Sequence, residues 1–387
     1  MFTLAERIKQ LPPYLFKEID QKKKAIAAKG VDIIDLGIGD PDLPTPPRII
    51  DAMVQAVRNP ANHHYPSYSG MEAFKIAISE WYQNRFSVTL DPESEVIALI
   101  GAKEGIANFS LAFLNPGDYA LIPAPGYPVY NSGTHFAGGR PYVLPLYKEN
   151  DFLPELASIP DEIARNATIL WLNYPNNPTA AVADRHFFEE VIAFANAHDI
   201  MVCNDLTYSE IAFDGYKPMS FLEAKGAKDR GIEFHSLSKT FNMTGWRIGF
   251  AVGNSEAIKG LGAIKSNIDS GIFQAIQVAG IEALRAVEES SEAMQTIYTR
   301  RRDSMVNGLR ECGFTVNPPK ATFYLWVAVP DSYTSVGIAT RLLEEAGVVV
   351  TPGNGFGDPG EGYIRIALTK DESRLVEAIE RIQNIGI

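Results

Sequence analysis

The sequence predicts an α/β protein with a mostly parallel sheet and a smaller α+β domain beside it. Three observations lead to this fold class. Short apolar runs alternate with helix-length segments, polar clusters follow several of these runs directly, and the pattern changes after about residue 273. Short continuous apolar runs are typical of strands that helices cover on both faces, because neither face of such a strand is solvated.

The expected elements follow in chain order. After a proline-rich loop at 41–47, two amphipathic helical stretches lie between Ile49 and Phe86. Strand-like runs then occur at 95–100, 119–122, 168–173, 200–203, 232–235 and 248–252. A long helical stretch reaches about Cys312, and helices alternate with strand-like runs at 323–328, 348–350 and 363–367. This organisation predicts a large domain over 45–285 and a smaller, discontinuous domain made of 1–44 and 286–387.

Polar clusters follow four of the strand-like runs at the point where each run ends. These clusters are 101–105, 174–178, 204–205 and 236–239. In parallel α/β sheets, ligands bind beyond the carboxyl ends of the strands. Since scattered surface polarity would occur at both edges of the sheet, clusters gathered at one edge favour a binding site there.

The composition is that of an ordinary globular protein and argues against several classes of function. The chain has 387 residues, of which 46% are hydrophobic and 21% are charged, and its net charge is -12 at pH 7. No stretch of basic residues is longer than the short run 22–24, so nucleic-acid binding is not expected. The sequence shows no transmembrane segment or secretory signal, so we expect a cytoplasmic protein without a membrane partner.

Cysteines and histidines indicate neither a disulfide nor a metal centre. Cys203 and Cys312 lie in apolar surroundings far apart in the sequence, so buried free thiols are expected. His63 and His64 form the only adjacent histidine pair, and no cysteine or carboxylate lies at ligand spacing from them. We therefore predict no metal site.

Lys239 is the candidate for covalent cofactor chemistry. Ser236 and Ser238 precede it, and Arg247 follows eight positions later. A lysine amine condenses with a carbonyl group when burial or nearby cations lower its pKa, and hydroxyl and guanidinium groups bind phosphate. The combination suits an aldehyde cofactor that carries a phosphate. A lone lysine in a polar loop is usually only a solvated surface residue, so the assignment depends on further matches.

Further residues suited to such a cofactor occur elsewhere in the sequence. The run SLSKTFNMTGWRIG, residues 236–249, resembles the cofactor-lysine motif of class I and II aminotransferases, which use pyridoxal 5'-phosphate. The cofactor needs a lysine, an anion at its pyridine nitrogen, donors to its phenolic oxygen and a phosphate-binding cup. The resemblance extends over essentially the whole chain. It implies the fold of the fold-type I transferases, with a large domain around a mostly parallel seven-stranded sheet and a smaller α+β domain.

The resemblance implies a role for each residue around the cofactor ring. Asp205 would pair with the pyridine nitrogen, Tyr208 and Asn177 would donate to the phenolic oxygen, and Tyr127 would stack on the ring. Lys239 would hold the cofactor covalently and move a proton, so that Lys239, Asp205 and Tyr208 form the predicted catalytic set. Taken alone, Asp205 could equally be a cap or turn residue, Asn177 a turn residue, and either tyrosine a core residue.

The phosphate cup is predicted from a helix N-terminus and from polar side chains. Ala102 and Lys103 follow a strand and begin a helix, where backbone amides and the helix dipole favour an anion. Ser236, Ser238 and Arg247 would complete the cup. The glycines are too few and wrongly spaced for a P-loop or a Rossmann fingerprint, so nucleotide binding is disfavoured. Many relatives have serine or glycine in place of alanine at position 102, which here removes one possible hydroxyl and keeps the amide.

Arg365 is the candidate for binding the substrate carboxylate. It lies within an apolar strand-like run, and a buried arginine is costly unless it is paired. A substrate carboxylate held by both arms of the guanidinium would be such a partner, while a structural ion pair is the alternative. The resemblance implies these further substrate contacts: Tyr14, Gly39, Lys103, Tyr127 and Asn177.

The family forms homodimers with shared active sites, in which a tyrosine of the partner subunit reaches the cofactor phosphate. Tyr65 matches that tyrosine, and the segment 267–274 is a further candidate for crossing the interface. Within the family, the segments 11–16, 36–41, 268–274 and 352–357 are most similar to LL-diaminopimelate aminotransferases. This implies amino transfer between LL-diaminopimelate and 2-oxoglutarate by a ping-pong mechanism, in lysine biosynthesis.

Other functions stay open from the sequence alone. An aspartate- or alanine-type aminotransferase, or a pyridoxal-phosphate-dependent C–S lyase, would share the cofactor residues and differ where the substrate binds. A regulator that senses the cofactor would ordinarily carry a DNA-binding module, and no basic module precedes Leu36. A nicotinamide-dependent oxidoreductase is disfavoured because its glycine fingerprint is missing.

Overall fold

In the computed structural model, the described residues are 2–9, 11 and 15–387, with the backbone alone described for 15–20. The helices are α1 (Glu6–Lys9), α2 (Leu15–Ala27), α3 (Pro47–Val57), α4 (Glu72–Phe86), α5 (Ala102–Phe113), α6 (Val129–Phe136), α7 (Asp161–Arg165), α8 (Arg185–His198), α9 (Ala227–Arg230), α10 (Leu237–Thr240), α11 (Ser255–Ile268), α12 (Gln274–Arg285), α13 (Val287–Glu311), α14 (Ser335–Ala346) and α15 (Glu372–Ile385). The strands are β1 (Ile34–Asp35), β2 (Val96–Leu99), β3 (Tyr119–Ala124), β4 (Arg140–Pro145), β5 (Ala167–Leu172), β6 (Met201–Asp205), β7 (Gly231–Ser236), β8 (Gly249–Gly253), β9 (Tyr324–Ala328), β10 (Val348–Val349), β11 (Thr351–Pro352) and β12 (Tyr363–Ala367).

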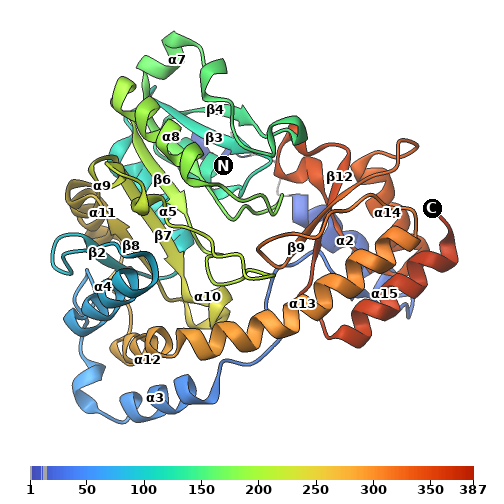
Figure 1. Cartoon of the computed structure of the whole chain (residues 1–387), viewed down its shortest axis with the longest axis horizontal. Coiled ribbons are helices and arrows are strands. Elements are labelled where there is room, and N and C mark those ends of the chain that lie inside the picture. Colours follow the sequence, from blue (N-terminus) through green and yellow to red (C-terminus); the bar gives the residue numbers. More distant parts are fainter. Residues whose placement is uncertain (1, 10, 12–14) are drawn as a thin grey trace.

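Within the described residues, the largest sheet has seven strands in the order β2-β8-β7-β6-β5-β3-β4 (Figure 1). The strands from β7 to β4 pair in parallel, and β8 is antiparallel to both of its neighbours. The mostly parallel α/β sheet is therefore confirmed. The sequence patterns did not indicate β4, because Pro141 and Pro145 interrupt its apolar run. A strand at the edge of a sheet tolerates proline, since one side of its backbone has no neighbouring strand.

Side chains alternate between the two helical layers that cover this sheet. On one face, Leu121 and Leu170 belong to a core formed with α4, α8 and α12. On the other face, Ile122 and Trp171 belong to a core formed with α5, α6 and α11. Because both faces are buried, these strands have apolar side chains at successive positions, which is the pattern that the sequence showed.

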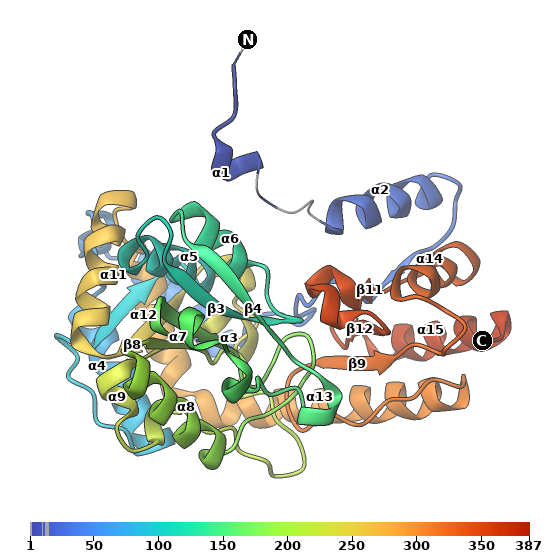
Figure 2. The ribbon, with the colours of Figure 1, turned by 90° about the horizontal axis from the view of Figure 1, so that it is seen from above.

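A further core surrounds the three-stranded sheet β11-β12-β9 and the helices α13, α14 and α15 (Figures 1 and 2). The N-terminal segment contributes to this core, because Ile34 and Leu36 are buried in it and β1 pairs in parallel with β10. Helix α13 extends from the end of α12 toward this small sheet (Figure 1). The division of the chain at residues 44 and 285 stays a prediction.

The topology places the predicted polar clusters together. The strands β2, β5, β6 and β7 run in the same direction, so their carboxyl ends meet at one edge of the sheet. Cys203 and Cys312 are both buried free thiols, as the sequence predicted. Among the helices of the described residues, none combines the length and the apolar character that a membrane span requires.

Candidate active site

Lys239 lies in the short helix α10, directly after β7. The Ser236 side chain caps this helix by accepting a hydrogen bond from the Ser238 amide at 3.2 Å. The Nζ atom of Lys239 donates to the carbonyl oxygen of Gly39 at 2.6 Å. Burial lowers the pKa of Lys239, because a low-dielectric environment disfavours the charged amine. The environment therefore favours the neutral amine that attacks a carbonyl group.

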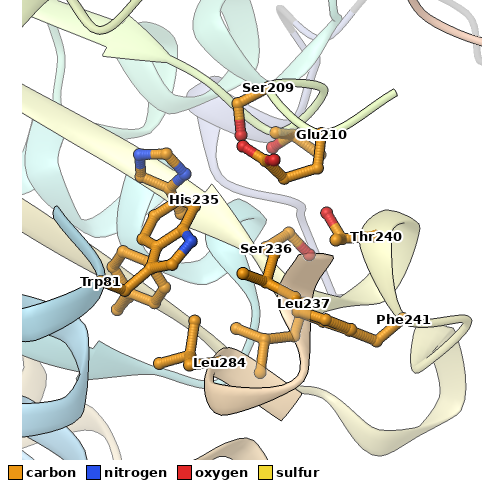
Figure 3. A pocket seen from close by; sticks show the side chains of 12 residues that line it. Trp81, Ser209, Glu210, His235, Ser236, Leu237, Thr240, Phe241 and Leu284 are labelled. Atoms are coloured by element: carbon orange, nitrogen blue, oxygen red, sulfur yellow. The ribbon is translucent and has the colours of Figure 1, made fainter. Parts of the chain in front are cut away.

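A small cavity lies beside the strand end that presents Lys239. Figure 3 shows His235, Ser236 and Thr240 lining it, with Trp81 and Leu284 from the helices α4 and α12. Its volume is about 10 Å³, which admits at most about one water molecule. Burial lowers the pKa of His235 to about 3, so this imidazole is neutral at physiological pH. The cavity is too small for a substrate, and its lining belongs to the packing that supports β7 and α10.

Asp205 is the last residue of β6, and the chain itself satisfies both of its carboxylate oxygens. The Tyr130 hydroxyl donates to Oδ2 at 2.9 Å, and the Thr207 hydroxyl donates to Oδ1 at 2.6 Å. Burial raises the pKa of Asp205, and the hydrogen bonds from Thr207 and Tyr130 oppose that rise. The Asn173 side chain donates to the Asp205 carbonyl at 2.7 Å and accepts from the Asn177 amide at 2.8 Å. The Asn173 side chain thereby links the end of β5 to the end of β6.

Arg365 lies on β12, is 4% exposed and is held by neutral groups. Its Nη1 donates to Oδ1 of Asn177 at 2.8 Å, and its Nη2 donates to the Gly37 carbonyl at 2.6 Å. The guanidinium lies 4.2 Å from the ring centroid of Tyr324 and 4.6 Å from that of Phe356. Among the described residues, its Nε has no hydrogen-bond partner and its charge has no carboxylate partner. The structural ion pair left open by the sequence is therefore not formed within this part of the chain.

Tyr324 lies against two further candidate residues, Gly39 and Tyr208. A Cβ atom on Gly39 would overlap the Tyr324 hydroxyl, so only glycine allows this close approach. The Tyr208 hydroxyl donates to the Tyr324 hydroxyl at 3.3 Å. Burial raises the pKa of Tyr208, which keeps its hydroxyl protonated at neutral pH. Gly39 thus lies against Lys239 on one side and Tyr324 on the other.

Candidate donors to a phosphate lie at the N-terminus of α5, which begins at Ala102, and in α10. Arg247 lies close to this helix start, because a Cβ atom on Gly101 would overlap its guanidinium. The Ser238 hydroxyl is buried and has no hydrogen-bond partner among the described residues. A helix N-terminus, a guanidinium and an unpaired hydroxyl are ligands for an anion with several oxygen atoms. These residues fit the phosphate of pyridoxal phosphate, and the buried Asp205 fits its ring nitrogen.

The other predicted site residues differ in where they lie. Tyr127 is half-buried and packs edge-on against Tyr130, with ring centroids 6.0 Å apart. Lys103 is exposed in the first turn of α5, and Tyr65 is 87% exposed. Tyr14 lies outside the described residues. Their roles stay predictions.

Several residues of the site were missed in the sequence: Tyr130, Asn173, Thr207, Tyr324 and Phe356. Tyr130 follows Tyr127 by about one helical turn and Thr207 follows Asp205 by two residues, so local spacing could have indicated both. Tyr324 reaches the site only because β9 pairs with β12, and no local pattern indicates that contact. The missing signal was a long-range pairing, which a single sequence does not show.

The sheet topology, the buried lysine, the buried acid and the donor groups for an anion are together the features expected of a pyridoxal-phosphate-dependent enzyme of fold type I. The family model for aminotransferase class I and II matches residues 31–382. The chain belongs to that family, and it is a pyridoxal-phosphate-dependent aminotransferase. The predicted family, fold class and cofactor are thereby confirmed.

The chain resembles several named relatives over its full length. It is 57% identical over 385 residues to the LL-diaminopimelate aminotransferase of Syntrophobacter fumaroxidans, covering 100% of this chain and 99% of that protein. It is 54% identical over 387 residues to the LL-diaminopimelate aminotransferase of Aquifex aeolicus, covering 100% of both. The solved structure of substrate-bound BacF from Bacillus subtilis has a TM-score of 0.95 and 40% identity, covering 100% of this chain and 98% of that one.

Proposed function

We propose that this aminotransferase moves the amino group of LL-diaminopimelate to 2-oxoglutarate, as a step of lysine biosynthesis. The relatives that carry the name LL-diaminopimelate aminotransferase support this donor, because their identity of more than 50% extends over the whole chain. The matched length includes the segments that contribute to the candidate site. Amino donor and amino acceptor would use the same site in turn.

The observation that carries the proposal is the buried charge of Arg365, which has no carboxylate partner among the described residues. Burying a guanidinium without an anion is costly, and the hydrogen bonds to Asn177 and Gly37 orient this one without neutralising it. A carboxylate is the natural partner of such a fork. Both the proposed donor and 2-oxoglutarate carry a carboxylate next to the reacting carbon, so Arg365 can hold either substrate in the same orientation.

Lys239 is proposed to move the proton that the reaction requires. Pyridoxal phosphate, when bound, withdraws electrons from the substrate α-carbon and so makes its proton acidic. The neutral, desolvated amine of Lys239 would take that proton and later return it, which is general base and then general acid catalysis. Gly39 positions the amine through its carbonyl oxygen. The burial of Lys239 would limit the access of water to its amine during the proton transfer.

The remaining candidates would hold the cofactor in register with Lys239. Asp205 would accept a hydrogen bond from the ring nitrogen, and Tyr208 and Asn177 would donate to the phenolic oxygen. The Oδ1 atom of Asn177 accepts a hydrogen bond from Arg365, so its Nδ2 would be the atom that donates to the cofactor. Tyr127 would lie on the ring. The phosphate ligands are proposed to be Ala102, Lys103, Ser236, Ser238 and Arg247.

A panel of amino donors tests the proposal. With 2-oxoglutarate as acceptor, glutamate formation is measured for LL-diaminopimelate, aspartate and alanine at equal concentrations. We expect LL-diaminopimelate to give the highest kcat/KM. An inert LL-diaminopimelate beside an active aspartate or alanine would reject the proposed donor and leave the class intact. Release of ammonia and a 2-oxo acid without any acceptor would instead indicate a lyase.

Two copies of the chain are proposed to complete each site, with Tyr65 of one subunit reaching the cofactor phosphate of the other. The exposure of Tyr65 in the single chain supports this. Mixing a Tyr65→Phe chain with a Lys239→Ala chain tests it, because a hybrid dimer would contain one site with both residues intact. Recovery of activity on mixing is expected, and no recovery despite hybrid formation would reject shared sites.

Further proposals concern the substrate contacts, the domains and the location. Tyr14, Gly39 and Lys103 are proposed to contact the substrate, and the chain is proposed to divide into 45–285 and a smaller domain of 1–44 and 286–387.

A cytoplasmic location is also proposed, and the two buried free thiols support such a reducing environment. Fractionation of the producing cells checks the location.

A further inference from the structure

The acid proposed to meet the cofactor ring has an unusual aromatic partner. Tyr130 is buried to 1% exposure on the first turn of α6 and donates its hydroxyl to Oδ2 of Asp205 at 2.9 Å. Its ring stacks on Trp171 of β5, with centroids 5.2 Å apart and planes inclined by 19°. The aromatic stack and the hydrogen bond together leave the phenol little freedom to turn away from the carboxylate.

The same helix start carries the ring-stacking candidate. Tyr127 lies two residues before the start of α6, and the Tyr130 amide donates to the Tyr127 carbonyl at 3.3 Å. The two rings contact each other edge-on. One short stretch of chain therefore supplies both a side chain for the face of the cofactor ring and a hydroxyl for the acid at its nitrogen.

We propose that Tyr130 is a positioning residue of the aminotransferase, whose hydroxyl orients the Asp205 carboxylate and stabilises its anionic form opposite the cofactor's ring nitrogen. The inference rests on the proposed role of Asp205. Tyr130 does not touch the reacting carbon. It acts through Asp205, because an anion at this position keeps the ring nitrogen protonated and hence the ring electron-withdrawing.

The surroundings of Asp205 make this hydrogen bond consequential. The carboxylate is buried, which raises its pKa and favours the neutral acid. Thr207 and Tyr130 donate the side-chain hydrogen bonds that oppose this effect. Tyr127 on the same helix start and Tyr208 after β6 are further titratable groups on this side of the sheet. Burial and the Asp205 charge raise the pKa of Tyr130, so the phenol stays a donor at neutral pH.

The decisive variant is Tyr130→Phe, which removes the hydroxyl and keeps the ring stack on Trp171. The holoenzyme is reconstituted with cofactor labelled with ¹⁵N at the ring nitrogen, and its NMR signal is followed with pH. We expect the ring nitrogen of the variant to lose its proton at a lower pH than that of the wild type. The cofactor dissociation constant should rise about tenfold, as for loss of a hydrogen bond to a charged group.

A control and an opposite variant complete the test. Tyr298→Phe removes another buried tyrosine hydroxyl, one without a hydrogen-bond partner among the described residues, and should leave the ring-nitrogen titration unchanged. Replacing Tyr130 by 3-fluorotyrosine keeps its shape and makes the phenol a stronger donor, so the ring proton should be retained to higher pH. Equal titrations for wild type, Tyr130→Phe and the fluorinated protein would overturn the proposal. Because the readout needs no amino donor, that result is distinct from a failure of the donor panel.

Discussion

The half of the site that faces the large sheet and the half that faces the small sheet are built in different ways. The proposed cofactor half takes Asp205 from the end of β6, and Ser238 and Lys239 from α10, which follows the neighbouring parallel strand β7. The proposed substrate half takes Gly39 and Arg365 from segments more than three hundred residues apart in the sequence. The first half is fixed by one sheet, whereas the second depends on how the small core meets the large one.

The two halves also differ in how their charges are treated. Asp205 receives hydrogen bonds on both carboxylate oxygens from Tyr130 and Thr207. Arg365 is oriented by neutral carbonyl oxygens, and its charge is not compensated within the described residues. The proposed roles would explain this difference: Asp205 would meet a cofactor that stays bound, whereas Arg365 would bind carboxylates that exchange in each turnover.

Lys239 lies where the two halves meet, so its loss should have the largest effect. Lys239→Ala removes both the covalent attachment of the cofactor and the proton-transfer group, and general acid–base catalysis alone contributes 10²–10⁴-fold. We expect kcat to fall by at least about 10⁴-fold, measured as glutamate formation. Lys259→Ala, at an exposed lysine, is the control. Substantial turnover by Lys239→Ala would contradict the assignment of the catalytic amine.

Arg365→Lys should damage the substrate half alone. An ammonium keeps the charge and cannot form the paired hydrogen bonds of the guanidinium fork. We expect kcat/KM to fall by about 100-fold for donor and acceptor alike, equivalent to about 2.7 kcal/mol, with the cofactor dissociation constant unchanged. If cofactor binding weakens instead and KM stays the same, Arg365 has a structural role and does not bind the substrate.

Ser238→Ala should show the converse pattern in the cofactor half. The Ser238 hydroxyl is buried without a partner among the described residues, and a phosphate oxygen would satisfy it. We expect the cofactor dissociation constant to rise about tenfold, with KM for the donor unchanged once the enzyme is saturated with cofactor. Ser266→Ala, at an exposed serine, is the control. Equal cofactor affinity in both variants would remove Ser238 from the phosphate ligands.

The same contrast explains how much could be predicted from the sequence. The proposed cofactor half is signalled locally, because its polar residues lie at or just after the ends of apolar strands, so the sequence could place Asp205 and Lys239 at one edge of the sheet. Arg365 was recognisable as a charge within an apolar strand, whereas Tyr324 was not, since its contact with Gly39 depends on the pairing of β9 with β12. The edge strand β4 was missed because its prolines obscure the pattern, although an edge position permits them.

The smallest expected effect is on the free energy of unfolding. Its pH dependence tests whether the Lys239 amine is desolvated in the folded chain. Burial lowers its pKa from the ordinary value of 10.5. Between the lowered pKa and 10.5, the unfolded chain therefore binds more protons at this site than the folded chain. The free energy of unfolding contributed by this residue must then rise with pH across that window.

Urea denaturation of the cofactor-free protein between pH 7 and pH 10 measures this contribution. Relative to the wild type, Lys239→Met should be more stable at pH 7, because it removes the cost of burying a lysine that is charged in the unfolded chain. That advantage should shrink as the pH rises toward 10, whereas Lys259→Met, at an exposed lysine, should give a curve parallel to the wild type. A constant difference between Lys239→Met and wild type across the range would mean that the amine is solvated.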